Sequence, residues 1–442
     1  MTSTADSEGG DQPAYQGGVA ALTLLLLINL FNYIDRYVLA AVEPLIRAEF
    51  FPKGSPDEAS AGFRMGLLAT AFLVSYMLTA PVFGWLADRW HRWAIVGIGV
   101  LVWSFASGGS GLAKVWVVML AMRIFVGIGE AAYGPTAPTL ISDMFPVRRR
   151  GAVLAWFYAA IPVGSALGYL LGGLVAGSLT WHWAFLLTLP PGLALGVSCF
   201  LMKDPPRGAA DGAVHRHASL SDYLVLARTP SYVLSVAGMT AFTFAIGGIS
   251  FWMPTYLHEH RGQENLPHVN MIFGGITVVA GLTATLFGGW LGDKLRSRLS
   301  GSYFLVSGGG MLVGFPFFIA SLYAPMPLGY VFIFMAIFFL FLSTGPSNAI
   351  LANVTHPSIR ATGFALSIFF IHALGDAVSP PIIGLITDAT KTPQDPKGNM
   401  TLGFLVVGAM ILLSGALWMW GSAFLARDIE LAPTRLANKA RS

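Results

Sequence analysis

The chain has 442 residues, of which 55% are hydrophobic and only 11% are charged, and its formal net charge is +4. Soluble globular proteins carry about 25% charged residues, so this composition excludes a water-soluble enzyme, a disordered chain and a secreted disulfide scaffold. The single cysteine, Cys199, excludes an internal disulfide and a cysteine-rich metal site. We therefore expect an all-α membrane protein, with no metal site and no nucleic-acid partner.

Residues 1–18 are polar and slightly acidic and contain no Lys or Arg. A signal peptide begins with basic residues before a short apolar core, so we expect a cytoplasmic tail followed by a first helix that is retained. Twelve apolar runs follow, each close to the length of about 20 residues that a membrane-spanning helix needs. Their approximate bounds are 19–45, 64–86, 94–112, 115–142, 151–177, 182–202, 232–257, 269–292, 302–322, 328–353, 361–387 and 400–425.

The longest internal polar stretch, 203–231, is rich in Pro, Gly and Asp and predicts a flexible cytoplasmic linker. It separates a six-helix half at 19–202 from a second at 232–426, and residues 427–442 form a predicted cytoplasmic tail. With both termini inside, the cytoplasmic segments hold 17 Lys and Arg and the outer segments 7. Because cytoplasmic loops collect basic residues, this bias supports an even number of spans.

Ionisable side chains within membrane spans are costly and are candidates for function. Span one holds Asp35 and Arg36, and span four holds Arg123 and Glu130, seven residues apart on one helical face. Adjacent side chains point about 100° apart on a helix, so we expect Asp35 to pair with Arg123 and Arg36 with Glu130. These pairs either fix the two spans together statically or contain a carboxylate that gains and loses a proton. For proton coupling, Asp35 is the first candidate and Glu130 the second.

The two halves repeat each other. The segment GWLADR at 84–89 returns as GWLGDK at 289–294, at an offset of 205, and Arg149 matches Arg360 at an offset of 211. Duplicated six-helix halves are typical of transporters whose substrate site lies between the halves. At the same offset of 211, the counterparts of Arg123 and Glu130 are Phe334 and Phe341.

A cavity that is ionic on one wall and aromatic on the other suits an amphipathic molecule. Its head group would meet the charged residues of spans one and four, and its tail the second half. Asn32, Asn348 and Asn353 leave a sugar substrate open. In span eleven, His372 and Asp376 share one face, either as a helix-packing hydrogen bond or as cavity ligands. The candidate second-half cavity residues are His372, Asp376, Asn348, Phe341 and Phe369.

The loop at 84–92 resembles the signature loop of the major facilitator superfamily, although His91 departs from it. The resemblance implies the fold of that superfamily: twelve transmembrane helices in two pseudo-symmetric halves. It also implies a latch that closes the cytoplasmic side, since an Asp at a helix end can approach the positive N-terminus of a neighbouring helix. The alternative is that the loop charges only set topology. The latch residues are Gly84, Asp88, Arg89, Arg92, Arg149, Gly289, Asp293, Lys294 and Arg360.

NYIDRYVLA in span one and RIFVGIGEAAYGP in span four look like the Spinster family of facilitators. The resemblance implies proton-coupled transport of lysophospholipids or sphingoid lipids, with no cofactor other than a proton gradient, by a protein of the bacterial plasma membrane that we expect to be monomeric. It further implies a head-group site formed by Arg36, Arg123, Glu130, Asn32 and Tyr33.

The chain has no Gly-Lys dipeptide, no His-Glu-x-x-His and no Gly-x-Ser-x-Gly, so the signatures of a phosphate-binding loop and of a hydrolase are missing. We therefore expect a protein that is not an enzyme. The alternatives are an exporter of another amphiphile or drug-like organic ion, and a lipid sensor that binds without transporting.

Overall fold

The computed structural model describes residues 17–87, 89–145, 147–206, 220–355 and 360–432. Within these ranges all regular secondary structure is helical, and twelve segments are long and apolar enough to cross a membrane. The twelve predicted spans are therefore confirmed. They run over Gly18–Phe50, Glu58–Ala87, Arg92–Gly111, Trp116–Ile141, Trp156–Val175, Trp181–Cys199, Pro230–His260, Leu266–Arg296, Ser302–Tyr323, Leu328–Val354, Gly363–Ala389 and Met400–Gly421.

The described residues of the first half form eight helices and one 3₁₀ turn, because two of the spans are broken. Span four breaks before Pro135, and span six breaks just before Pro190, since proline lacks the N–H that would continue the preceding helix. The helices are α1 (Gly18–Phe50), α2 (Ala61–Ala87), α3 (Arg92–Gly111), α4 (Trp116–Tyr133), α5 (Thr136–Met144), α6 (Val147–Ser178), α7 (Trp181–Leu186) and α8 (Leu189–Cys199), with the 3₁₀ turn η1 at Glu58–Ser60.

The second half contains two π-helical turns, η2 (Tyr256–His260) and η4 (His372–Asp376), which extend α10 and α15. Two short helices lie where the sequence predicts a linker and a tail, namely α9 (Leu220–Ala227) and α18 (Leu425–Leu431). The remaining helices are α10 (Pro230–Thr255), α11 (Leu266–Arg296), α12 (Ser302–Tyr323), α13 (Leu328–Phe341), α14 (Thr344–Val354), α15 (Arg360–Ile371), α16 (Ser379–Ala389) and α17 (Met400–Gly421).

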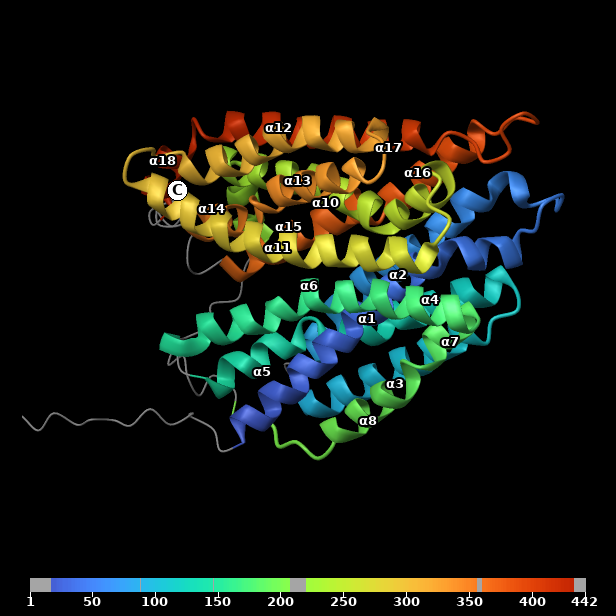
Figure 1. The fold of residues 1–442 in the computed structure, drawn as a ribbon. Helices are drawn as coiled ribbons and strands as arrows, with labels where there is room; N and C mark the ends of the chain where they lie inside the picture. The colour runs from blue at the N-terminus through green and yellow to red at the C-terminus, as the bar shows by residue number, and fades with distance from the viewer. Residues whose placement is uncertain (1–16, 88, 146, 207–219, 356–359, 433–442) are drawn as a thin grey trace, which may run out of the picture.

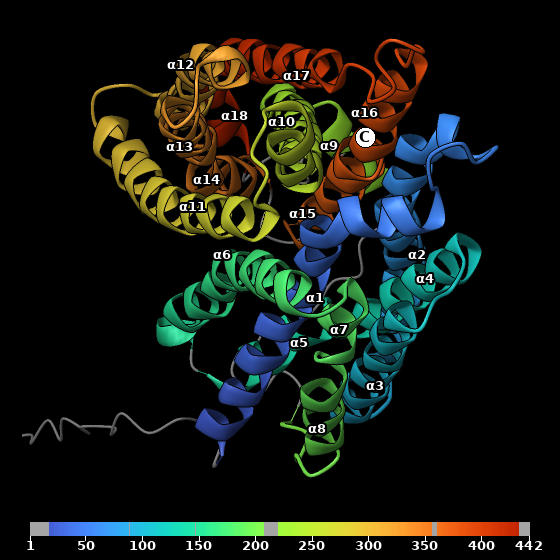
Figure 2. The same cartoon turned by 45° about the vertical axis from the view of Figure 1, so that its right-hand side comes forward.

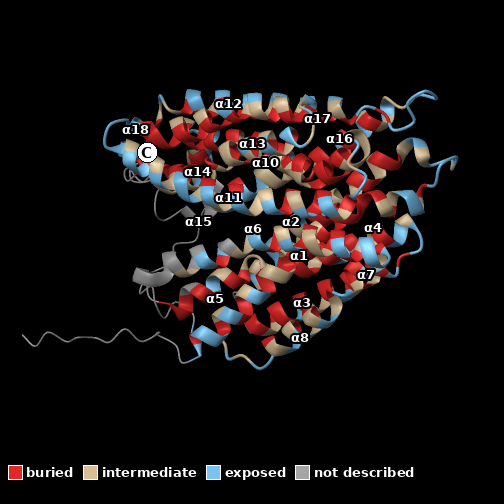
Figure 3. Cartoon of the chain, viewed as in Figure 1, coloured by how far each residue is buried: buried red, intermediate tan, exposed pale blue. Residues whose placement is uncertain are grey.

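Each half forms its own bundle, and the two bundles lie side by side (Figures 1 and 2). Buried faces point into the bundles and toward the seam between them, whereas the outer faces carry exposed apolar side chains, as expected of helices in contact with lipid (Figure 3). The halves meet mainly along α2 with α16 and α6 with α11, and α1 also contacts α10.

The two helix pairs come close because small residues line them. A Cβ on Gly66 of α2 would lie 2.5 Å from the backbone nitrogen of Pro381, and one on Gly384 would lie 2.2 Å from the carbonyl oxygen of Gly62. We call the end of the molecule that holds the α1–α2 connection, residues 51–60, the closed end. The hydrogen bonds and ion pairs that join described residues of the two halves lie between the middle of the molecule and this end.

Candidate functional site

Four charged side chains of α1 and α4 form two ion pairs in the core of the first half. Arg36 donates from Nε and Nη2 to Oε2 of Glu130, at 2.8 and 2.5 Å. Nη1 of Arg123 lies 3.6 Å from Oδ2 of Asp35. Both predicted pairings are therefore confirmed: the charges of α4 lie two turns apart on one helical face and pair with adjacent residues of α1.

Three of the four groups are almost completely buried: Asp35, Arg123 and Glu130 are 1%, 2% and 0% exposed. Removing one member of such a pair leaves an uncompensated buried charge, which costs about 3–5 kcal/mol. Arg36 differs from the other three because 23% of its side chain is exposed. Of the four charges, Arg36 is therefore the most accessible to a ligand.

The Asp35–Arg123 pair is supported by polar groups that the sequence analysis missed. Ser107 of α3 donates to Oδ1 of Asp35, and Ser110 accepts a hydrogen bond of 2.9 Å from Nη2 of Arg123. Thr188, between α7 and α8, lies 3.1 Å from the Ser107 hydroxyl. Among the described residues, Oδ2 of Asp35 has no hydrogen-bond partner. The run SFASGGSG in α3 carries Ser every three residues, which is the only sequence signal for this polar face.

Aromatic rings surround the Arg36 guanidinium. The Cζ atom of Arg36 lies 4.9 Å from the ring centroid of Tyr33, 4.7 Å from that of Phe72 and 5.6 Å from that of Tyr76. Cation–π contacts of this kind contribute about 0.5–1 kcal/mol each at exposed sites. The rings hold the guanidinium in one orientation, with Glu130 on one side and open space on another.

That open space is a cavity of about 130 Å³ between the two halves. Its polar lining comes mainly from the first half, through Arg36, Arg123, Tyr33 and Tyr37. Leu68, Leu73 and Phe72 of α2 add apolar surface, and the second half contributes Gly247, Ser250, Phe251, Asp376 and Pro380. The charges on the wall are therefore two arginines from one half facing one carboxylate from the other.

The predicted second-half residues do not all reach this cavity. Asp376 lines it, and Nδ1 of His372 lies 3.0 Å from Oδ1 of Asp376 within the π-helical turn η4. Asn348 is exposed and donates to the Thr344 carbonyl, Phe341 packs edge-on against Phe242, and Phe369 is half-exposed against Phe370. These last three do not line the cavity, and neither does the buried Asn32.

The predicted latch residues that the structure describes lie at the end opposite the closed end. Arg92 is 3% exposed and pairs with Asp143 of its own half, at 2.5 Å, and with Asp204 at the start of the predicted linker, at 2.8 Å. In the second half, Asp293 accepts a hydrogen bond from Tyr303 and Lys294 lies over the ring of Trp290.

For the other predicted latch residues, the described part of the structure gives no contact that joins the two halves. Arg89 lies over the ring of Trp85, and a Cβ on Gly84 or Gly289 would meet no atom closer than 3.9 Å. Asp88 and the side chains of Arg149 and Arg360 lie outside the described residues. The latch therefore stays a prediction.

A third charged cluster, at the closed end, was missed from the sequence. Glu43 of α1 is completely buried and accepts hydrogen bonds from Arg47, at 3.0 Å, and from Thr255 of the second half, at 2.6 Å. Arg47 also pairs with Glu259 of η2. Span one is predicted to end at about residue 45, but α1 continues to Phe50, so Arg47 lies inside the helix, where these two pairs compensate its charge.

The chain is similar in sequence to known membrane proteins. The family model of the Major Facilitator Superfamily matches residues 25–380. The chain is 36% identical to protein spinster homolog 3 of Danio rerio, over 93% of this chain and 86% of that protein. It is also 36% identical to protein spinster homolog 1 of Homo sapiens, over 94% of this chain and 81% of that protein.

Two solved structures have a similar fold. A bacterial homolog of the human lysosomal transporter Spinster, in an inward-facing and unoccupied conformation, superposes with a TM-score of 0.82 at 19% identity, covering 94% of this chain and 99% of that one. A D-xylose–proton symporter superposes with a TM-score of 0.75 at 16% identity, covering 93% and 98%.

Proposed function

The chain belongs to the Spinster family of the Major Facilitator Superfamily and is a transporter rather than an enzyme, and we propose that it moves an amphipathic lipid by proton-coupled alternating access. The lipid would be a lysophospholipid or a sphingoid-type lipid, whose charged head group binds Arg36. The transporter would act as a monomer in the plasma membrane of a bacterial cell.

The observation that carries this proposal is the asymmetric cavity. Arg36 presents a partly exposed guanidinium to it, and guanidinium groups bind phosphate through two parallel hydrogen bonds. Leu68, Phe251 and Pro380 supply apolar surface for the start of an acyl chain. A sugar would be bound mainly through hydrogen bonds on both walls, whereas the second half lines this cavity with the polar side chains of Ser250 and Asp376 beside Gly247, Phe251 and Pro380.

The proton pathway that we propose begins with competition for Arg36. A phosphate that takes the two N–H groups now donated to Glu130 leaves that carboxylate buried without its partner. A buried carboxylate without a counter-charge is unstable and takes up a proton. Head-group binding at Arg36 and protonation of Glu130 therefore favour each other.

Asp35 provides the second proton site in this proposal. Its Oδ2 has no hydrogen-bond partner among the described residues, and its contact with Arg123 is long, at 3.6 Å. A proton on Asp35 would release Arg123, which lines the cavity. Protonation can thus change the charge that the cavity wall presents to a substrate.

We infer the orientation from the excess of Lys and Arg in the loops that are predicted to be cytoplasmic. With both termini in the cytoplasm, the closed end faces outward and the described conformation is open to the cytoplasm. The inward-facing conformation of the similar bacterial homolog of Spinster supports this orientation.

Exchange across a membrane tests the proposal. Proteoliposomes preloaded with unlabelled lysophospholipid should take up labelled lysophospholipid by counterflow, with albumin extraction separating the two leaflets. Arg36→Lys should reduce exchange about tenfold because lysine lacks the planar fork. Arg228→Lys, at an exposed position before α10, is the matched control and should exchange normally.

Two other results identify the alternatives. Saturable lipid binding without exchange would identify a sensor. Exchange of xylose without exchange of lipid would identify a sugar transporter and overturn the lipid assignment.

A further inference from the structure

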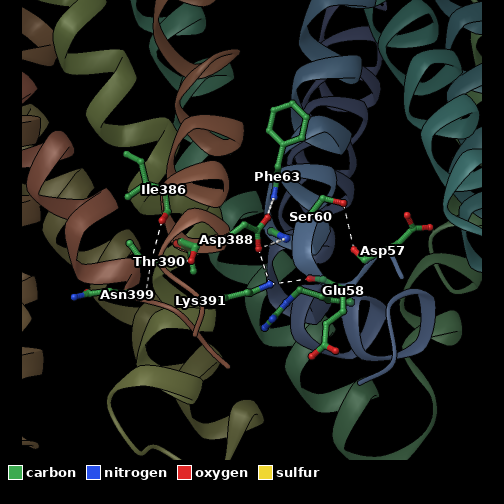
Figure 4. A network of polar contacts seen from close by, with 12 residues as sticks. Asp57, Glu58, Ser60, Phe63, Ile386, Asp388, Thr390, Lys391 and Asn399 are labelled. Atoms are coloured by element: carbon green, nitrogen blue, oxygen red, sulfur yellow. Dashed lines mark hydrogen bonds and ion pairs between the residues drawn. The ribbon is translucent and has the colours of Figure 1, made fainter. Parts of the chain in front are cut away.

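The seam between α2 and α16 contains a helix cap that crosses from one half to the other. Asp388 lies in the last turn of α16, and its carboxylate accepts hydrogen bonds from the backbone N–H groups of Gly62, at 3.1 Å, and Phe63, at 2.7 Å (Figure 4). Both groups lie in the first turn of α2, where N–H groups have no partner within the helix. The carboxylate also meets the positive end of the α2 dipole.

Lys391 ties the same carboxylate to a second element of the first half. Its Nζ lies 2.6 Å from Oδ1 of Asp388 and donates a hydrogen bond of 2.9 Å to the carbonyl oxygen of Glu58 in η1. The side chains of Asp388 and Lys391 are only 5% and 15% exposed. Separating the halves at this end therefore breaks three polar contacts together.

Gly384, one turn before Asp388, lets α16 approach α2 closely enough for the cap to form. A Cβ at position 384 would lie 2.2 Å from the carbonyl oxygen of Gly62, and one at position 62 would lie 3.0 Å from the carbonyl oxygen of Gly384. Any larger side chain at 384 would push the two helices apart and lift the carboxylate off the N–H groups.

The spacing of Gly384 and Asp388, a glycine four residues before an aspartate, occurs at few places in the chain. Three aspartates in the sequence have a glycine four residues before them, namely Asp88, Asp293 and Asp388. The first two belong to the loop signature near the ends of α2 and α11, away from the closed end. The third ends α16 at the closed end, and it is the one whose cap geometry the structure gives in full.

We infer that Gly384 and Asp388 form an outer latch, which holds the closed end shut by capping α2 and which uses the chemistry that the loop signature is expected to use at the other end. Opening this end transfers the carboxylate and the α2 N–H groups to water, so the latch sets the balance between the two conformations and takes no part in substrate binding. This inference rests on the alternating-access part of the proposed function and is independent of the lipid.

Distances across the closed end test the latch directly. Spin labels on Lys53→Cys and Gln394→Cys, both exposed and in opposite halves, would report the separation in a Cys199→Ala background. In Asp388→Asn, an amide can accept one of the two N–H bonds but does not carry the charge that holds Lys391. We expect the ratio of long to short distances to rise about tenfold, the loss typical of removing a helix cap.

The matched control is Asp395→Asn. Asp395 is exposed in the connection after α16, and its carboxylate is not among the contacts between the halves. Its distance distribution should equal that of the parent. An unchanged distribution in Asp388→Asn, or an equal shift in both variants, would overturn the latch.

A second pair of variants covers the case in which Asp388→Asn does not fold. Gly384→Ala should shift the distances in the same direction, whereas Gly309→Ala, where a Cβ meets nothing within 4 Å, should not. The outcome is separable from the proposed function. If the variants shift the distances but the parent does not exchange lipid, the lipid assignment is refuted and the latch is supported. If the parent exchanges lipid but the variants do not shift the distances, the latch is refuted and the lipid assignment is supported.

Discussion

Replacing Asp35 by asparagine should separate substrate exchange from proton coupling. The amide keeps the size of the side chain, and its oxygen can still accept the hydrogen bond from Ser107. It cannot bind and release a proton at physiological pH. The variant should therefore exchange lipid in counterflow but lose accumulation driven by a pH gradient.

The loss of stability in this variant can be bounded from the structure. At 3.6 Å and an effective dielectric constant of about 20, two unit charges attract by about 5 kcal/mol. Arg123 is 2% exposed but keeps its hydrogen bond to Ser110 and its position over the Phe185 ring, so the net cost lies toward the low end of the 3–5 kcal/mol expected for a broken buried pair. A destabilisation of about 3 kcal/mol should leave a folded protein with a lower melting temperature.

The assay needs a variant that distinguishes charge imbalance from loss of the proton site. In the double variant Asp35→Asn with Arg123→Gln, no uncompensated charge remains, so the melting temperature should recover in part. Accumulation driven by pH should stay absent. If the single variant still accumulates lipid against its gradient when a pH difference is imposed, Asp35 is not the coupling carboxylate and the reasoning fails.

Other contacts in the molecule give three further predictions. Gly66→Ala should shift the protein away from the described conformation, because the new Cβ meets the backbone of α16 at 2.5 Å; double-label distances should change there and stay unchanged in Gly309→Ala, where nothing lies within 4 Å. Glu43→Gln should also favour opening of the closed end, since Arg47 loses a charged partner, and faster alkylation of a cysteine placed on the α1–α2 connection would report it; unchanged alkylation would contradict the role given to this cluster. Arg92→Gln should destabilise the first half by about 3 kcal/mol, because it leaves two carboxylates without their shared cation; an unchanged melting temperature would show that this triad contributes no net stability.

Hydropathy alone predicts the spans of this protein well, because a membrane imposes one length and one polarity on every helix. The predicted bounds of a span are wrong where charged side chains within the helix are compensated by ion pairs. Span one is predicted to end at 45, but α1 continues to Phe50, because the charge of Arg47 is compensated by its ion pairs with Glu43 and Glu259. Partners 212 residues apart in the chain cannot be paired from sequence periodicity.

In the candidate site too, some contacts could be predicted from the sequence and others could not. The pairing of Asp35 with Arg123 and of Arg36 with Glu130 could be predicted, because helical geometry fixes which charges share a face. The ring cage around Arg36 and the serines beside Asp35 could not, since they depend on which helices become neighbours. The spacing of Gly384 and Asp388 is visible in the sequence, but its target, the first turn of α2, is known only from the fold.

The most direct test of the central claim is to record proton movement while lipid is transported. Proteoliposomes that hold a pH-sensitive dye and no initial pH gradient should change internal pH when lysophospholipid is added on one side, and a proton-conducting ionophore should abolish the change. Proton-coupled transport predicts a pH change that requires both the lipid and a functional Asp35. Lipid exchange at the normal rate with no movement of protons would contradict it.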